Sequence, residues 1–339
     1  MSISMNSQSA LHEVESRCTQ ERPPRCQSLC PLGLDARAFL GHAAEGRWSD
    51  ARKQLERYLP LPGLLARICD HPCEQGCLRG DLGGAVNLHG LEIFCTEHLG
   101  VQTRSLPMPR KQKRIAVIGA GLAGLVCAWD LAGKGYPVTV FHEGEPQAQL
   151  LSCWPVLAGA GAAALDAEWE ALGRRGVRFE QARTDAACLQ QAAGEYDGVL
   201  LDAGALPELA PAESGMEAQI LHWRDNICCA GWASVTPTGH RFASASRQAG
   251  QGRSAARTLE RLVAGVSLTA ARDTDERSLF TELDGIAPVE RVLPVAETYS
   301  EAEARQEAGR CLQCQCLVCV KACVYLQKYK GYPRVYAMD

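Results

Sequence analysis

The sequence predicts an α plus α/β fold, with a helical N-terminal domain, a parallel-sheet domain and a short cysteine-rich C-terminal tail. Three observations predict it. Apolar residues recur at helical spacing in the first hundred residues, short apolar strands alternate with helices from Ile115 onward, and cysteines gather near both ends. Alternating strands and helices are typical of a parallel sheet covered by helices. We therefore expect domains over residues 1–105, 113–268 and 269–339.

The first two domains are predicted from local patterns. Helical spacing predicts one helix from Ala36 to Leu59, ended by a proline-containing run, and another from Leu88 to Leu99. In the parallel-sheet domain the predicted strands cover 115–118, 138–141, 177–179 and 198–201, and the predicted helices cover 122–133 and 163–174. Residues 270–300 show little periodicity, and a helix over 301–308 leads to the last cysteine group.

The composition is that of a globular protein with two or three domains. The chain has 339 residues, 46% of them hydrophobic, and its 35 basic and 39 acidic side chains give a formal charge of −4. This charge argues against binding to nucleic acid. No apolar run approaches the roughly 20 residues of a membrane span, and the polar N-terminus lacks the apolar region of a secretory signal. We therefore expect a cytoplasmic protein.

The distribution of the 17 cysteines points to metal chemistry. An odd number without a secretory signal argues against a disulfide framework and for metal or redox chemistry in a reducing compartment. Ligands bunch because several sulfurs must reach one metal centre, whereas structural thiols scatter. The bunched cysteines form three groups, which are Cys18, Cys26 and Cys30; Cys69, Cys73 and Cys77; and Cys311, Cys314, Cys316, Cys319 and Cys323.

The last group repeats the spacing of the first, with an acid in place of one thiol. The matching positions, in order, are Cys18, Glu21, Cys26 and Cys30 in one copy and Cys311, Cys314, Cys319 and Cys323 in the other. Such tight spacing favours iron–sulfur clusters, because short loops turn several thiolates toward one cluster. Zinc, which prefers two Cys-x₂-Cys knuckles or one knuckle with a His pair, is the first alternative, and incidental thiols are the second.

A glycine-rich turn opens the parallel-sheet domain. Gly119, Gly121 and Gly124 lie between a predicted strand and a predicted helix, which is the context that a dinucleotide-binding turn requires. The glycines permit a tight turn and the close approach of a pyrophosphate to the N-terminus of the helix. A Rossmann-like domain kept only as a scaffold is the alternative.

These features together resemble a known family. The first two cysteine groups and Ala85–Glu92 resemble the N-terminal domain of the glutamate synthase small subunit, and the N-terminal region of dihydropyrimidine dehydrogenase is similar. The resemblance implies two [4Fe–4S] clusters in a helical domain. One implied ligand set is Cys18, the Glu21 position, Cys26 and Cys77, and the other is Cys30, Cys69, Cys73 and the Glu92 position.

Two of these positions depart from a simple thiolate set. Glu21 either ligates through oxygen, leaves an iron open, or marks a lost or three-iron cluster. Glu92 is either a ligand, as the corresponding Gln or Glu is in some relatives, or an ordinary residue on the surface of a helix.

In the same family the glycine turn follows the cluster domain and binds FAD. The acid expected at the end of the second strand is replaced by His142, with Glu143 one residue late, and Trp232 follows Gly231 where the family has Gly-Asp. Glu195–Ala205 resembles the family segment Tyr-Asp-Ala-Val-x-Leu-Ala-Thr-Gly-Ala. The pyrophosphate turn is thus intact while the ribose and ribityl contacts are weakened, and FAD binding and a flavin-free scaffold both stay open.

The nicotinamide domain of this family is missing. The family inserts it between segments that correspond to Ala205 and Ile227, and residues 206–226 are too few for a βαβ unit. We therefore expect that the chain by itself does not take hydride from a pyridine nucleotide.

The C-terminal cysteine group resembles that of larger flavoprotein-like chains known as dicluster-binding, in which further cluster-binding sequence follows. Residues 324–339 contain no cysteine. We expect the five C-terminal thiols to hold one [4Fe–4S] cluster, or to complete one with a partner chain.

No catalytic constellation is recognised in the sequence. We expect an iron–sulfur electron-transfer subunit, with or without flavin, that relays electrons to or from a partner. An autonomous FAD/Fe–S oxidoreductase like the glutamate synthase small subunit is one alternative, and a metal-stabilised assembly protein without redox turnover is another. The expected partner is a further Fe–S or redox protein, bound through the C-terminal tail and its residues Tyr325, Tyr329, Tyr332, Pro333 and Tyr336.

Overall fold

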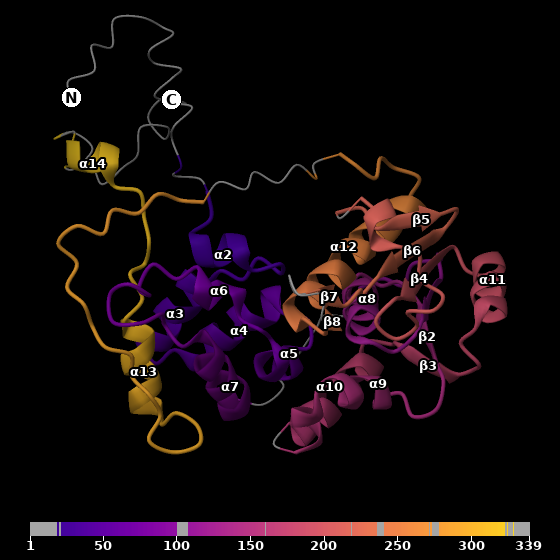
Figure 1. Cartoon of the computed structure of the whole chain (residues 1–339), viewed down its shortest axis with the longest axis horizontal. Helices are drawn as coiled ribbons and strands as arrows, with labels where there is room; N and C mark the ends of the chain where they lie inside the picture. Colours follow the sequence, from indigo (N-terminus) through magenta and orange to yellow (C-terminus); the bar gives the residue numbers. More distant parts are fainter. Residues whose placement is uncertain are drawn as a thin grey trace, which may run out of the picture.

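The computed structural model describes residues 19, 22–99, 108–159, 161–217, 219–235, 241–270, 272, 278–322, 324 and 328. A body of helices and a body built on a sheet lie side by side, and the C-terminal segment returns from the second body to the first (Figure 1). The predicted fold class, helical and then α/β, is confirmed. The expected boundary between residues 105 and 113 stays a prediction, because most of the linker lies outside the described residues.

Short helices form the described part of the N-terminal body. They are α2 (Arg25–Leu29), α3 (Ala36–Ala44), α4 (Trp48–Tyr58), α5 (Pro62–Ile68), α6 (Pro72–Gln75) and α7 (Leu88–Leu99). The single helix predicted from Ala36 to Leu59 is wrong, because α3 and α4 replace it. Gly46 adopts a φ of +73° just after α3, a left-handed conformation that ends a helix and that glycine adopts without steric cost.

The second body contains one sheet of six strands in the order β3-β2-β1-β4-β6-β5. The strands are β1 (Ile115–Ile118), β2 (Val138–His142), β3 (Arg178–Gln181), β4 (Gly198–Asp202), β5 (His222–Arg224) and β6 (Ile227–Ala230). All neighbouring pairs are parallel except β5 with β6. The order β3-β2-β1-β4 is that of a Rossmann-like half. A separate antiparallel pair joins β7 (Ser234–Val235) to β8 (Arg241–Phe242).

Helices cover both faces of the sheet. Strand side chains alternate, so that Ile115 and Val117 pack toward α8 (Leu122–Gly133) and α12 (Ala245–Val263), whereas Ala116 and Ile118 pack toward α11 (Ala186–Glu195). The remaining helices of this body are α9 (Ala148–Cys153) and α10 (Ala162–Arg174), with 3₁₀ turns at Pro155–Ala158 and Glu213–Gly215.

The long helix α12 is not among the helices that the sequence predicted. Ser244 caps it by accepting a hydrogen bond from the Arg247 amide at 3.3 Å. Most of its buried face consists of small residues, including Ala249 and Ala256, and it lies against α8. Alanines and glycines carry a weak apolar signal, so the pattern did not stand out from the sequence.

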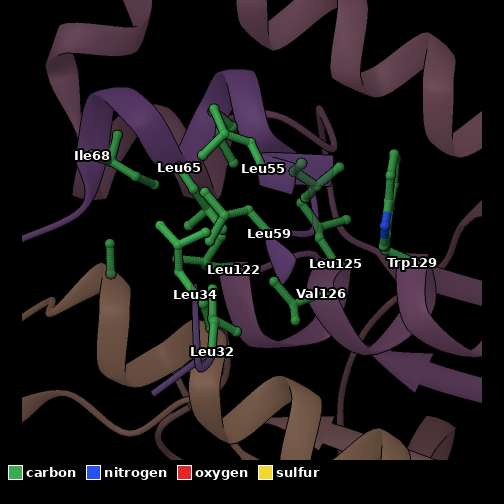
Figure 2. Close-up of a cluster of buried hydrophobic side chains, with 14 of the residues drawn as sticks. Leu32, Leu34, Leu55, Leu59, Leu65, Ile68, Leu122, Leu125, Val126 and Trp129 are labelled. Atoms are coloured by element: carbon green, nitrogen blue, oxygen red, sulfur yellow. The ribbon is translucent and has the colours of Figure 1, made fainter. Parts of the chain in front are cut away.

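The two bodies share one hydrophobic core. Figure 2 shows Leu32, Leu34 and Leu65 of the N-terminal body beside Leu122 and Leu125 of α8. All five side chains are buried. The glycine turn therefore begins a helix whose outer face is covered by the helical body, so the two bodies are held in a defined arrangement.

The C-terminal segment docks on the N-terminal body through α13 (Glu301–Gly309), which packs against α3 and α7 (Figure 1). Ser300 and Glu303 form a capping box at its start. Buried Glu307 accepts hydrogen bonds from the amides of Asn87, at 2.8 Å, and Val292, at 2.7 Å. Arg310 pairs with Glu307 at 2.7 Å. The cysteine loop that follows thereby reaches the N-terminal body, where Arg37 contacts Cys314 and Gln313. The short α14 (Val318–Ala322) comes after this loop.

Within the described residues, no helix is both long enough and apolar enough to cross a membrane.

Candidate cluster sites and the glycine turn

The described ligand candidates gather in two places, which we call the inner and the outer site. The inner site is lined by Cys30, Cys69, Cys73 and Glu92. The outer site is lined by Cys26, Cys77, Cys311 and Cys314. Cys18, Glu21 and Cys323 lie outside the described residues, and only the backbone of Cys319 is described. The structure thus brings together two groups, each with four donor side chains.

Two short helices contribute to both sites. Cys26 lies on α2 and Cys30 is the residue that follows it, while Cys73 lies on α6 and Cys77 comes four residues later. Helices α2 and α6 are in contact. Each short helix, with the residues directly after it, therefore supplies one thiol to each site, and the two sites are neighbours.

Burial dominates the electrostatics of the inner site. Desolvation, reinforced by the nearby Glu92 carboxylate, raises the pKa of the Cys69 and Cys73 thiols far above its usual range. Glu92 is itself buried and lies with Oε2 at 3.4 Å from Nε2 of His71. Burial lowers the pKa of His71, but the hydrogen bond and charge of Glu92 outweigh it and raise that pKa overall. Glu92 therefore faces the thiols rather than an exposed surface.

The thiols of the outer site lie close enough to influence one another. Burial raises the pKa of Cys26 to about 12, with further increases from Cys311, Cys77 and Cys314. Burial raises the pKa of Cys311 to about 11, and Cys314 and Cys77 again add to the effect. A cluster that binds these sulfurs as thiolates stabilises the deprotonated form, so metal binding and deprotonation are coupled.

Specific contacts hold the C-terminal loop at the outer site. Arg37 Nη1 donates a hydrogen bond to the carbonyl of Cys314 at 2.7 Å, and Gln313 Nε2 donates to the carbonyl of Arg37 at 3.0 Å. Sequence reasoning missed that Cys311 and Cys314 join Cys26 and Cys77. The equal spacing of the first and last cysteine groups could have indicated this arrangement, because Cys314 of the last group is a thiol where the first group has Glu21. Cys316 lies beside Arg37 in an adjoining groove.

The donor chemistry fits iron–sulfur clusters. Thiolates are the usual ligands of such clusters, and the two sites supply seven thiols and one carboxylate. In the described part of the chain, no three His, Cys, Asp or Glu side chains converge closely enough to hold a single ion. Ligands of a four-iron cluster bind different irons and so lie further apart than ligands of one ion, which is the arrangement expected here.

The glycine turn has the backbone conformation of a nucleotide-binding turn. Gly119 adopts a φ of +102°, and Gly121 is the N-cap of α8. The space in front of the helix holds the carboxylate of Asp202, whose Oδ2 accepts a hydrogen bond from the Gly124 amide at 2.6 Å. Burial raises the pKa of Asp202 to about 6, against the lowering effect of its amide hydrogen bonds. The carboxylate thus lies at the start of α8, where a helix N-terminus favours an anion.

The other residues predicted to contact FAD are placed as follows. His142 is buried at the end of β2, where its Nδ1 lies 3.0 Å from the carbonyl oxygen of Gly144. Glu143 is exposed. Gly231 adopts a φ of +99°, and its amide donates to Gln251 Oε1 at 2.8 Å. Neither His142 nor Glu143 is hydrogen-bonded to the glycine turn in the contacts of the described residues.

The two cysteine sites lie on helices that pack against a Rossmann-like domain, which is the order of domains that the resemblance predicts. Residues 1–103 match the sequence profile of dihydropyrimidine dehydrogenase domain II, 4Fe-4S cluster. Residues 114–193 match the profile of glucose inhibited division protein A. The predicted resemblance is confirmed, and the two matches support the [4Fe–4S] clusters and the FAD that it implied.

Curated relatives agree with this class. The chain is 34% identical over 120 residues to the NADPH-Fe(3+) oxidoreductase subunit beta of Geobacter sulfurreducens, a match that covers 34% of this chain and 18% of the relative. It is 32% identical over 142 residues to the NADP(+)-dependent formate dehydrogenase subunit beta of Moorella thermoacetica, covering 34% and 20%. It is 30% identical over 137 residues to the glutamate synthase [NADPH] small chain of Mycobacterium tuberculosis, covering 40% and 28%.

The chain therefore spans less than a third of the length of these relatives. Their names describe subunits of oxidoreductases, which agrees with the predicted class of electron-transfer subunit.

Proposed function

We propose that the chain is an iron–sulfur electron-transfer subunit, in which two adjacent [4Fe–4S] clusters pass electrons one at a time to or from a partner redox protein. The observation that carries the proposal is the sharing of α2 and α6 by the inner and outer sites. Neighbouring clusters can exchange electrons directly, whereas isolated metal sites that only stabilise a fold have no need of this arrangement.

The proposed ligands of the inner cluster are Cys30, Cys69, Cys73 and Glu92. The supporting observation is that all four line one buried pocket together with apolar side chains. Those side chains exclude water, which strengthens the electrostatic interactions of the cluster. His71 is placed to hold the Glu92 carboxylate by its contact at 3.4 Å.

The proposed ligands of the outer cluster are Cys26, Cys77, Cys311 and Cys314. This set replaces the Cys18 and Glu21 positions that the family resemblance implied. Four thiolates form a complete cubane set, whereas a set with Glu21 has one carboxylate. Arg37 and Gln313 position the C-terminal loop through their hydrogen bonds. On this proposal the C-terminal repeat serves the N-terminal body of the same chain.

The partner is proposed to bind at the outer site and the C-terminal segment. The inner site is enclosed by the shared core, so the outer cluster is the accessible end of the relay. Exposed apolar side chains lie on the cysteine loop and on α14, namely Leu317 and Val318, and Phe280 is also exposed. Cys316, Cys319 and Cys323 follow the outer ligands and remain for a cluster shared with the partner. The reducing cytoplasm is the proposed compartment, since all cysteines whose side chains are described are free.

Iron analysis and electron paramagnetic resonance of the anaerobically isolated chain test the proposal. The wild type should contain acid-labile sulfide and about eight irons in the two sites, four per cubane cluster, and its reduced form should show magnetically coupled signals. Cys73→Ala should remove the inner signal and Cys77→Ala the outer one, and each should abolish the coupling. Cys188→Ala, on α11 across the sheet, is the matched control and should change neither signal.

Stoichiometric zinc without sulfide would refute the cluster assignment. Two signals without coupling would refute the relay while leaving the clusters in place.

An autonomous FAD/Fe–S oxidoreductase remains the second candidate, because the glycine turn is formed and residues 114–193 match a flavoprotein-type profile. Against it, the described residues between β4 and β6 contain only a 3₁₀ turn and β5, and no βαβ unit that could bind a nicotinamide nucleotide. Rapid reduction of the isolated chain by NADPH would favour this second function.

A further inference from the structure

Asp202 lies where the phosphate of a bound dinucleotide would meet the start of α8. It is the last residue of β4, which pairs with β1, and the glycine turn follows β1 directly. Because strand side chains alternate, Asp202 shares the α8 side of the sheet with Leu200. The carboxylate at the end of β4 therefore lies next to the glycine turn that follows the neighbouring strand β1.

Backbone amides bind this carboxylate as they would bind a phosphate. The Gly124 amide donates to Oδ2 at 2.6 Å, and the amides of Gly204 and Ala205 donate to Oδ1 at 2.9 Å and 3.3 Å. Gly124 lies in the first turn of α8, where free amides and the helix dipole favour an anion.

Two glycines of the turn, and Gly231 after β6, enclose the carboxylate closely. A Cβ atom would lie 2.7 Å from Asp202 Oδ2 at Gly121, 2.9 Å from Oδ2 at Gly124 and 2.5 Å from Oδ1 at Gly231. The space that the missing side chains leave for a pyrophosphate is thus occupied by a side chain of the same protein. The family segment that Glu195–Ala205 resembles has alanine at the position of Asp202, and an alanine would leave this space open.

Among the residues that the structure describes, no cationic side chain pairs with this carboxylate. The titratable side chains near it are the thiols of Cys127 on α8 and Cys229 on β6, and burial raises the pKa of both. Cys229 points to the opposite face of the sheet, with Leu201. From α12 the neutral Gln248 approaches the same turn and donates to the carbonyl of Gly231 at 3.1 Å. A phosphate bound at the glycine turn would therefore lie beside the negatively charged Asp202 carboxylate, without a cation to offset the repulsion.

We propose that Asp202 is an intrachain substitute for the dinucleotide phosphate, so that FAD binds the glycine turn only when this carboxylate is displaced. Asp202 thereby sets the affinity of the domain for pyrophosphate-containing dinucleotides. The clusters and their relay do not depend on it, so this proposal and the proposed function can fail separately.

Titration of the full-length, cluster-loaded chain with FAD tests the proposal through quenching of flavin fluorescence. Asp202→Ala should raise the affinity for FAD roughly 10- to 100-fold, since the ligand no longer has to break charge-assisted hydrogen bonds to the amides. Asp197→Ala removes one carboxylate from the surface of the same domain and is the matched control. This variant should bind FAD with the same affinity as the wild type.

The pH dependence gives a second readout that needs no alanine variant. The FAD affinity of the wild type should rise as the pH falls below about 6, where Asp202 takes up a proton, and Asp202→Asn should lack this rise. Iron content and circular dichroism show whether each variant folds. Tight, pH-independent binding of FAD by the wild type would overturn the proposal, as would a well-folded Asp202→Ala with no gain in affinity.

Discussion

Glu168 offers a test of how the two bodies are held together. It lies on α10, is 2% exposed, and accepts a hydrogen bond through Oε1 from the Gly63 amide at the start of α5, at 2.6 Å. Its second oxygen, Oε2, has no hydrogen-bond partner. Burial raises the pKa of Glu168 to about 7, in spite of the Gly63 hydrogen bond and the nearby charge of Arg52.

The raised pKa of Glu168 determines how the free energy of unfolding changes with pH. The folded state holds the proton of Glu168 more tightly than the unfolded state, so this group stabilises the fold fully only below the unfolded pKa. Stability falls as the pH rises from about 4.5 to about 7, the unfolded and folded pKa values. A difference of between two and three pKa units corresponds to about 3 kcal/mol of unfolding free energy.

Thermal unfolding of the anaerobically loaded chain at several pH values measures this effect. Glu168→Gln keeps an acceptor for the Gly63 amide but carries no charge, so it should unfold with the wild type near pH 4.5. At pH 8 it should unfold roughly 4 °C higher, because the variant does not pay the cost of about 3 kcal/mol for ionising a buried carboxylate.

Glu170→Gln is the matched control for this experiment. Glu170 is an exposed neighbour on the same helix and pairs with Arg174 at 3.2 Å. Its substitution should change the unfolding temperature little at any pH. An equal shift in both variants, or none at pH 8 in Glu168→Gln, would refute the reasoning.

Two further predictions concern the redox sites. Cys314→Ala should remove the outer cluster signal and leave the inner one, because the proposed outer set then has three thiols. Cys316→Ala, two residues further along the loop, is the control and should retain both signals. If Cys18→Ala loses the outer signal while Cys314→Ala keeps it, the ligand set implied by the family resemblance is favoured instead. NADH and NADPH should not bleach the visible absorption of the isolated chain in a stopped-flow experiment, since residues 206–226 do not house a nicotinamide domain. Bleaching without a partner protein would contradict this.

Much of the fold was predictable because local patterns are strong in both bodies. The apolar runs at Ile115–Ile118 and Gly198–Asp202 are fully buried strands, as expected for the centre of a parallel sheet. The helix beginning after Gly121 also follows from the turn that precedes it. The break at Gly46 was missed because the apolar spacing continues across it, and spacing alone does not reveal a left-handed residue.

Part of the candidate sites was likewise predictable from local sequence patterns, and part depended on contacts between distant segments. The cysteine spacing by itself determined that this chain carries tight groups of cysteines, and short loops around a cluster leave such a local signature. The grouping of Cys30, Cys69, Cys73 and Glu92 was expected from a family resemblance, and the structure places these four side chains in one pocket.

Only the tertiary structure decided where Cys311 and Cys314 lie and what occupies the glycine turn. The first depends on the docking of α13 by buried Glu307 and Arg310, which bond to Asn87 and Gly83, more than two hundred residues away in the sequence. The second depends on strand pairing, which brings Asp202 within 2.6 Å of the Gly124 amide. Both are contacts between distant segments, and such contacts leave no period or spacing in the sequence, because each partner alone has the pattern of an ordinary helix or strand.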